Sequence, residues 1–175
     1  MFGGNTKKQD GPLLEFAKLA NKKGCKITVI TEKLHLNLPT KDGSFLKVKL
    51  ENSGFDWIEK KNLTLQYLKK NIDKNSIGIS LNSIWIFNDE IINFFNGNLY
   101  NYHDTPLPEF RGAAAYSWLI LLNQKKWGIT MHKVVPSLDV GNIVKQHFFI
   151  FPKSCRIPQD YLDYKIKFEK KFFST

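Results

Sequence analysis

The chain has 175 residues, of which 42% are apolar and 24% are charged. A sequence of this size and composition can build one compact domain with a buried core, which excludes a disordered tail, a collagen-like fibre and a heptad coiled coil. Its 26 basic and 16 acidic residues leave a formal net charge of +10, which favours an anionic partner such as tRNA, a nucleotide or a phosphorylated substrate.

The first half of the chain alternates between helical and strand-like patterns. Pro12 suits the first turn of a helix and Gly24 suits its end. Only residues 1–4 precede this segment, so the first strand of the sheet is expected to be truncated. The patterns that follow predict a strand over 26–31, a strand over 45–50, a helix over 62–70 and a buried parallel strand over 77–81.

The second half continues the alternation. Asn88 or Asp89 can cap a helix that ends at Gly97. An α/β fold with a mostly parallel sheet is therefore predicted, because strands and helices follow one another in turn. The elements expected here are a strand over 99–103, a helix over 113–122, strands over 128–135 and 142–151, and a last helix from Pro158 with a stripe of Tyr161, Tyr164, Phe168 and Phe172.

The two cysteines give no sign of a metal site. Cys25 and Cys155 lie far apart and outside any Cys-x-x-Cys or Cys/His pattern, so we expect both to be buried in a reducing compartment. The longest apolar stretch, 118–122, is far shorter than the ~18 residues that a membrane-spanning helix needs. The sequence therefore predicts a soluble, cytoplasmic protein with no bound metal and no membrane partner.

Polar side chains gather where two predicted strands end. Asn101 and His103 are two residues apart on a strand, so they share a face at its carboxyl end, where open α/β sheets bind ligands. Asp139 follows another strand and can return to the same edge. An amide donor, an imidazole that titrates near neutrality and a carboxylate suffice for acyl transfer to an amine. His132 and His35 have no such neighbours in the sequence and are interpreted as ordinary histidines, although His132 lies two residues after Thr130 on a strand that can face the site.

Four short segments carry a resemblance to a known family. They are Asn-Tyr-His at 101–103, Leu-Pro-Glu-Phe-Arg-Gly at 107–112, Gly-Ile-Thr at 128–130 and Leu-Asp-Val-Gly at 138–141. In this order and at these separations they resemble the folate-dependent formyltransferase family. The resemblance implies the α/β, Rossmann-like formyltransferase fold, with helices on both faces of the sheet, in a single catalytic domain over 1–175 that is incomplete at both ends.

The resemblance also implies a reaction and a set of site residues. Formyl transfer from 10-formyltetrahydrofolate to a primary amine would use Asn101 and His103 at the formyl oxygen, while Asp139 orients His103 and helps to take up the proton of the amine. No metal is implied. The residues expected to bind the folate are Trp85, Ile86, Phe87, Asp139, Val140 and Gly141. Those expected to bind the acceptor are Pro106, Leu107, Pro108, Arg111 and Gly112.

The acceptor stays open at this point. Thr105 and Pro106 resemble the sugar- and peptide-modifying branches, residues 111–114 resemble the methionyl-tRNA branch, and Trp118 resembles the sugar-nucleotide branch. Glycinamide ribonucleotide formyltransferases, the purine-synthesis branch of the family, are less similar at residues 103–106. The expected partners are therefore a small-molecule amine or an aminoacyl-tRNA, and a homodimer is compatible with the sequence.

Three other functions are consistent with the same residues. Water in place of the amine would make the protein a 10-formyltetrahydrofolate hydrolase. A fragment that keeps the pocket without a complete fold would be a non-catalytic folate-binding module. The charge of +10 also fits a nucleic-acid-binding protein, although no nucleic-acid-binding motif accompanies it.

Overall fold

Strands and helices alternate along the computed structural model, which describes residues 1–4, 11–112 and 114–174. The strands are hydrogen-bonded in the order β3-β2-β1-β4-β5-β6-β7, which is the order of a doubly wound sheet with one strand added at the edge. The predicted Rossmann-like, mostly parallel α/β fold is therefore confirmed. The elements are β1 (Phe2–Gly3), α1 (Pro12–Lys22), β2 (Thr28–Thr31), α2 (Lys33–Leu36), α3 (Leu46–Glu51), β3 (Asp56–Glu59), α4 (Leu65–Asn71), β4 (Gly78–Leu81), α5 (Asp89–Phe94), β5 (Leu99–His103), α6 (Ala115–Leu121), β6 (Lys126–Lys133), β7 (Ile143–Ile150) and α7 (Pro158–Ser174).

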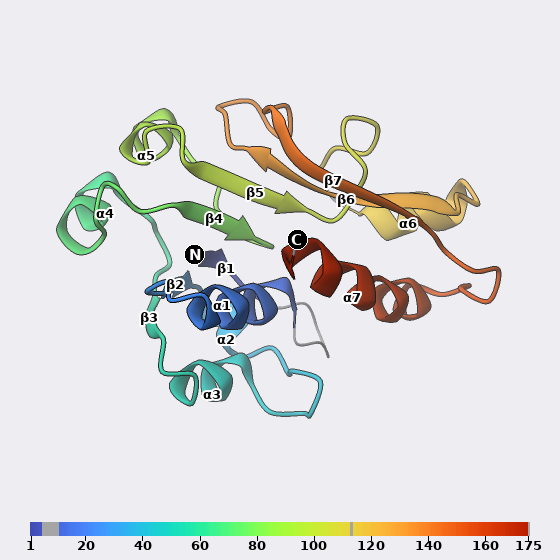
Figure 1. The fold of residues 1–175 in the computed structure, drawn as a ribbon, viewed down its shortest axis with the longest axis horizontal. Coiled ribbons are helices and arrows are strands. Elements are labelled where there is room, and N and C mark those ends of the chain that lie inside the picture. Colours follow the sequence, from blue (N-terminus) through green and yellow to red (C-terminus); the bar gives the residue numbers. More distant parts are fainter. Residues whose placement is uncertain (5–10, 113, 175) are drawn as a thin grey trace. The chain divides into compact units, whose positions relative to one another are not determined.

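The chain divides into two compact units, Met1–Tyr100 and Asn101–Thr175, so β5 begins in the first unit and ends in the second. In the first unit β1 lies between β2 and β4 and pairs with both in parallel (Figure 1). Phe2 of β1 packs edge-on against Phe87 and Phe95, with ring centroids 5.3 and 5.8 Å apart. The short first strand is therefore fixed by a cluster of aromatic rings.

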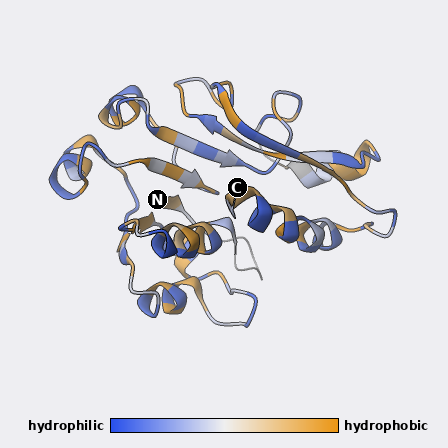
Figure 2. Ribbon diagram, viewed as in Figure 1, coloured by the Kyte–Doolittle hydropathy of each residue, from blue (hydrophilic) through white to orange (hydrophobic). Residues whose placement is uncertain are grey.

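Helix α1 shows the end signals that the sequence predicts. Pro12 stands in its first turn, and Gly24 comes directly after the C-cap residue Lys23 with φ of 86°, a conformation that glycine adopts without strain. Leu13, Leu14 and Ala17 are buried, which leaves the charged side of the helix to solvent. Figure 2 shows this alternation of hydrophobic and hydrophilic residues along α1.

One predicted strand is a helix. The segment 45–50, expected as a strand, forms α3 over Leu46–Glu51. Leu46 and Leu50, four residues apart, are buried on one side, whereas Val48 is exposed. The apolar residues thus follow the helical spacing, and the imperfect alternation was the sign of it. Helix α2 and strand β3 were not predicted, because each is only four residues long, too short to show a clear period.

Two substitutions distinguish the helix from a strand in this segment. We expect Leu50→Ala to lower the free energy of unfolding by about 2–5 kcal/mol, since Leu50 is only 1% exposed. Val48→Ala should change it by less than about 0.5 kcal/mol, because Val48 is 40% exposed. Urea unfolding of the two variants measures both values. Equal losses would contradict the helix, because Val48 and Leu50 share a face only in a strand.

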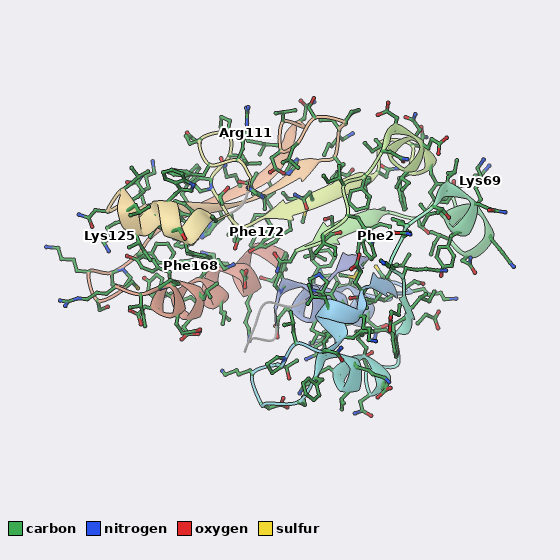
Figure 3. All side chains as sticks on the ribbon, turned by 180° about the vertical axis from the view of Figure 1, so that it is seen from behind. Phe2, Lys69, Arg111, Lys125, Phe168 and Phe172 are labelled. Atoms are coloured by element: carbon green, nitrogen blue, oxygen red, sulfur yellow. The ribbon has the colours of Figure 1, made fainter. Side chains whose placement is uncertain are left out.

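The second unit contains an antiparallel hairpin covered by aromatic residues of α7. Strands β6 and β7 pair from Lys126 opposite Ile150, and the register shifts between Met131 and His132. Phe168 of α7 stacks on Phe149 of β7 with ring centroids 4.3 Å apart and planes 7° from parallel. Figure 3 labels Phe168 and Phe172 on this helix. The predicted aromatic stripe is therefore the face that packs on the hairpin.

The two cysteines differ in their surroundings. Cys155 is buried, as expected. Cys25 is exposed, so the expectation for it was wrong: it follows the end of α1 in a solvent-exposed turn. Within the described residues, no helix combines the length and apolar character needed to cross a membrane.

Candidate functional site

Polar side chains from β5, from β6 and from the loop between β6 and β7 meet in the second unit. Asn101 and His103 lie on β5, and Asp139 lies in the loop between β6 and β7. Asn101 Nδ2 is 3.5 Å from Asp139 Oδ1, and His103 Nε2 is 3.8 Å from Asp139 Oδ2. The structure thus brings together the three residues singled out in the sequence as catalytic. The distance of 3.8 Å is too long for a hydrogen bond, so Asp139 faces His103 without bonding to it.

His132 of β6 is a fourth member of this group. Its Nε2 lies 3.2 Å from Asn101 Nδ2 and 3.5 Å from Asp139 Oδ1, and the residue is 2% exposed. The interpretation of His132 as an ordinary histidine is therefore wrong. The spacing of Thr130 and His132 on one strand was the available signal. The register shift beside His132 was not readable, because it depends on how β7 pairs with β6.

Backbone carbonyls fix where the two imidazole rings carry their protons. His132 Nδ1 is 2.9 Å from the carbonyl oxygen of Lys133, which can only accept, so this nitrogen donates. In the neutral ring Nε2 then accepts from the Asn101 amide. His103 Nε2 donates in the same way to the carbonyl oxygen of Phe110, 3.1 Å away. One N–H of Asn101 is therefore taken by His132, and the other is only at the long limit of a bond to Asp139.

The backbone around Asp139 is shaped to aim its carboxylate. Asp139 has φ of 53°, in the left-handed region that Asp tolerates better than most residues. Its Oδ2 accepts a hydrogen bond of 3.1 Å from the backbone N–H of Gly112. At Gly141 a Cβ atom would lie 1.8 Å from the carbonyl oxygen of Lys133, so only glycine fits there. The loop therefore approaches β6 closely and presents Asp139 to the two histidines.

The segment 104–112 is held in place by hydrogen bonds from the hairpin. Thr130 Oγ1 donates to the carbonyl oxygen of Thr105 at 2.8 Å and accepts from the N–H of Leu107 at 3.3 Å. Gln146 Nε2 donates to the carbonyl oxygen of Leu107 at 2.7 Å. Trp127 Nε1 donates to the carbonyl oxygen of Asp104 at 3.0 Å. Thr130, from the Gly-Ile-Thr motif, thus uses its hydroxyl to hold residues 104–112 in place rather than to contact a ligand.

The residues expected to bind the acceptor differ in accessibility. Pro106 and Leu107 are buried, and a cis peptide bond joins Leu107 to Pro108. Pro108 and Arg111 are exposed, and Figure 3 shows Arg111 on the loop that follows β5. Gly112 is half-buried and is tied to Asp139. A role of all five in binding the acceptor stays a prediction.

The residues expected to bind the folate lie in both units. Trp85, Ile86 and Phe87 belong to the first, where the Trp85 Nε1 donates to the carbonyl oxygen of Lys61 at 3.1 Å and Ile86 is largely exposed. Phe87 is buried against Phe2. In the second unit, Leu138 and Val140, which precede and follow Asp139 in the chain, are exposed apolar residues. Together with Gly141 they flank the polar group.

Buried carboxylates in this unit link the stability of the protein to pH. Burial alone would raise the pKa of Asp139, but the proximity of His132, 3.5 Å away, and the charge of His103 hold it below its ordinary value of 3.8. Burial also acts to raise the pKa of Asp104, and Lys165 lowers it below that value. A carboxyl group whose pKa is depressed on folding adds stability above its ordinary pKa and loses it as the pH falls through the folded value.

We therefore expect the free energy of unfolding to be highest above about pH 4 and to decrease as the pH falls toward about 2. Urea unfolding across this range measures the decrease. Asp139→Asn should make the curve flatter below pH 4, since one of the depressed carboxyl groups is then absent. A variant curve as steep as that of the unchanged protein would contradict the assignment to Asp139.

Together, the four side chains can donate hydrogen bonds and exchange protons, and one of them keeps a negative charge. Asn101 supplies amide donors, His103 and His132 supply imidazoles, and Asp139 supplies a carboxylate that is ionised at neutral pH. These are the parts needed to stabilise charge on an oxygen and to move a proton. In the described part of the chain, no group of three or more His, Cys, Asp or Glu side chains is arranged to hold a metal ion.

Comparison with known proteins relates this geometry to a family. Residues 26–155 match the family model described as formyl transferase. Phosphoribosylglycinamide formyltransferase from Bacillus halodurans is 19% identical, with a TM-score of 0.72 over 98% of this chain and 90% of that one. An N-formyltransferase from Helicobacter canadensis, solved with folinic acid and dTDP-3-aminofucose, is 22% identical, with a TM-score of 0.76 over 98% of this chain and 59% of that one. A formyltetrahydrofolate deformylase from Pseudomonas syringae pv. tomato is 16% identical, with a TM-score of 0.74 over 99% of this chain and 58% of that one.

Proposed function

This chain belongs to the formyl transferase family, and we propose that it transfers a formyl group from 10-formyltetrahydrofolate to a primary amine through Asn101, His103 and Asp139. The observation that carries the proposal is the meeting of these side chains, with His132, at distances of 3.2 to 3.8 Å from three separate segments. A donor, a proton carrier and a fixed negative charge at one point are what acyl transfer to an amine requires.

Each residue has a role that follows from its hydrogen bonds. The second N–H of Asn101, only weakly engaged by Asp139, donates to the formyl oxygen as negative charge develops on it. His103 donates to the same oxygen or carries the proton, once its Nε2 leaves the carbonyl of Phe110. Asp139 stabilises the positive charge of His103 and favours proton loss from the amine. His132 holds Asn101 and Asp139 in place.

In the proposed transfer, the bond that forms, the bond that breaks and the proton that moves are all accounted for. The amine nitrogen bonds to the formyl carbon, the bond from that carbon to the donor nitrogen breaks, and the proton lost by the amine passes to the departing nitrogen. Bound 10-formyltetrahydrofolate would supply the formyl carbon. The site fits such a donor, because the exposed Leu138 and Val140 offer apolar surface beside Asp139. The resemblance of the sequence supports Trp85, Ile86, Phe87 and Gly141 as further proposed folate contacts.

The proposed acceptor is an amino sugar nucleotide or an aminoacyl-tRNA. The Helicobacter canadensis protein was solved with dTDP-3-aminofucose, a nucleotide-linked sugar that carries an amine. The exposed Arg111, with Gly112 beside it, offers a cation for the phosphate of such an acceptor. The net charge of +10 attracts either polyanion.

Hydrolysis of the folate donor is the second candidate function. The Pseudomonas syringae deformylase has a similar fold, and the same four side chains would activate water as they would an amine. One assay separates the candidates: purified protein is incubated with 10-formyltetrahydrofolate and, in turn, a dTDP-amino sugar, glycinamide ribonucleotide, methionyl-tRNA or no acceptor.

The release of tetrahydrofolate is the measured quantity. Release that requires an acceptor supports the transferase and identifies the acceptor. Release without any acceptor indicates a hydrolase. Folate binding without release would overturn both candidates and leave a folate-binding module.

A further inference from the structure

A buried ionic cluster fastens both residues that flank His103 in the sequence. Tyr102, on the face of β5 opposite His103, donates a hydrogen bond of 2.6 Å from its hydroxyl to Glu169 Oε1. Asp104 accepts a hydrogen bond of 3.0 Å from Lys165 Nζ. Lys165 and Glu169 are one turn apart on α7, and their charged atoms are 2.8 Å from each other. The helix therefore holds the chain immediately before and immediately after His103.

The cluster is deeply buried and keeps its charges. Lys165 and Glu169 are each 3% exposed. Burial acts to lower the pKa of Lys165, but Asp104 and Glu169 raise it well above its ordinary range, so the ammonium group persists. Burial and the charge of Glu169 raise the pKa of Tyr102 well above its ordinary range, so the hydroxyl keeps the proton that it donates. Lys165 and Tyr102 therefore keep the protons that they donate in these contacts at neutral pH.

Stability by itself is a poor reason for such a cluster. The cost of removing charges from water commonly equals or exceeds their mutual attraction, and well-packed apolar residues serve as well or better. The aromatic stripe of α7 already packs on the hairpin through Phe168 and its neighbours. The ionic contacts add what apolar packing does not, which is a fixed direction for the backbone on each side of His103.

We propose that Lys165 and Glu169 are positioning residues that hold His103 in its working orientation by fastening Tyr102 and Asp104. The proposal rests on the proposed function, in which His103 acts on the formyl oxygen or on the proton. The cluster lies behind β5, so it does not touch the ligand that Asn101 and His103 face. Its loss should therefore affect the rate of the chemical step rather than the binding of substrate.

The test compares Glu169→Ala with Glu169→Gln in the full chain. The substrates are 10-formyltetrahydrofolate and the acceptor that the assay described above identifies. Glu169→Ala should lower kcat by about 10-fold to 100-fold and change KM by less than about threefold, because a small misplacement of reacting groups lowers the rate by about this factor. Glu169→Gln keeps an acceptor for Tyr102 and should recover kcat to within about threefold. Lys167→Met removes an exposed lysine of the same helix and should leave kcat and KM unchanged.

A second measurement does not depend on catalysis. The imidazole proton resonances of His103, identified by their loss in His103→Ala, should move or broaden in Glu169→Ala but not in Glu169→Gln or Lys167→Met. Should Glu169→Ala not fold, Tyr102→Phe takes its place: it leaves every charge of the cluster but removes the hydrogen bond to Glu169, so it should move the same resonances. Unmoved resonances in folded Tyr102→Phe would then overturn the positioning role.

Two results separate a failure of the positioning role from a failure of the proposed function. A folded Glu169→Ala protein with unchanged kcat and unmoved His103 resonances would overturn the positioning role. Failure of the unchanged protein to release tetrahydrofolate with any acceptor would overturn the proposed function instead. In that case the His103 resonances alone decide whether the cluster positions the ring.

Discussion

His103→Ala should lower kcat for formyl transfer by about 10²–10³-fold, the loss typical of removing one donor to a developing oxyanion. The imidazole is 12% exposed, lies 3.8 Å from Asp139 and is held by the carbonyl oxygen of Phe110. Alanine removes both the donor and the proton carrier while leaving Asn101 in place. The rate of tetrahydrofolate release at saturating acceptor measures the loss.

The matched control is a histidine outside the group. His147→Ala removes the ring on β7 that stacks with Phe149, and kcat should stay within about threefold of the unchanged protein. Thermal unfolding of both variants shows whether each is folded at the assay temperature. A folded His103→Ala protein that retains full activity would exclude His103 from the chemistry.

Trp127→Ala should lower the free energy of unfolding by about 3–5 kcal/mol, the usual cost of deleting a large aromatic side chain from a core. Trp127 is completely buried, and its ring lies 4.7 Å from that of Phe110. Its Nε1 donates to the carbonyl oxygen of Asp104, next to His103. The substitution leaves a cavity and an unsatisfied carbonyl under the segment 104–112.

Trp118→Ala is the matched control, because Trp118 is 54% exposed on α6. It should change the free energy of unfolding by no more than about 1 kcal/mol. Urea unfolding at neutral pH measures both variants. A loss for Trp127→Ala as small as that expected for Trp118→Ala would show that the hairpin core does not depend on Trp127.

Strand and helix positions were predicted best where the sequence has a helix-capping or helix-ending residue, or a clear helical or strand periodicity. Pro12 and Gly24 bound α1, and the side chain of Asn88 accepts the capping hydrogen bond from Ile91 N–H, 3.1 Å away, at the start of α5. The segment 45–50 was predicted wrongly, because a window of six residues fits both periods and only burial of Leu46 and Leu50 together decides between them.

The candidate site was predictable in part. Alternation on β5 placed Asn101 and His103 on one face, and the loop after β6 was expected to return Asp139 to them. For His132 only the spacing with Thr130 pointed to the site, because its contacts with Asn101 and Asp139 join segments far apart in the chain. The fastening of the segment 104–112 by Thr130 and Gln146 likewise depends on contacts between residues far apart in the chain.

The sequence by itself determined the alternation of strands and helices, the family and the residue types that the reaction needs, since propensity, periodicity and motifs are local properties of a chain. The tertiary structure alone decided the distances within the polar group, the protonated nitrogens of the two histidines and the hold of α7 on Tyr102 and Asp104. These features depend on burial and on hydrogen bonds that join distant segments. Neither exists until the chain has folded.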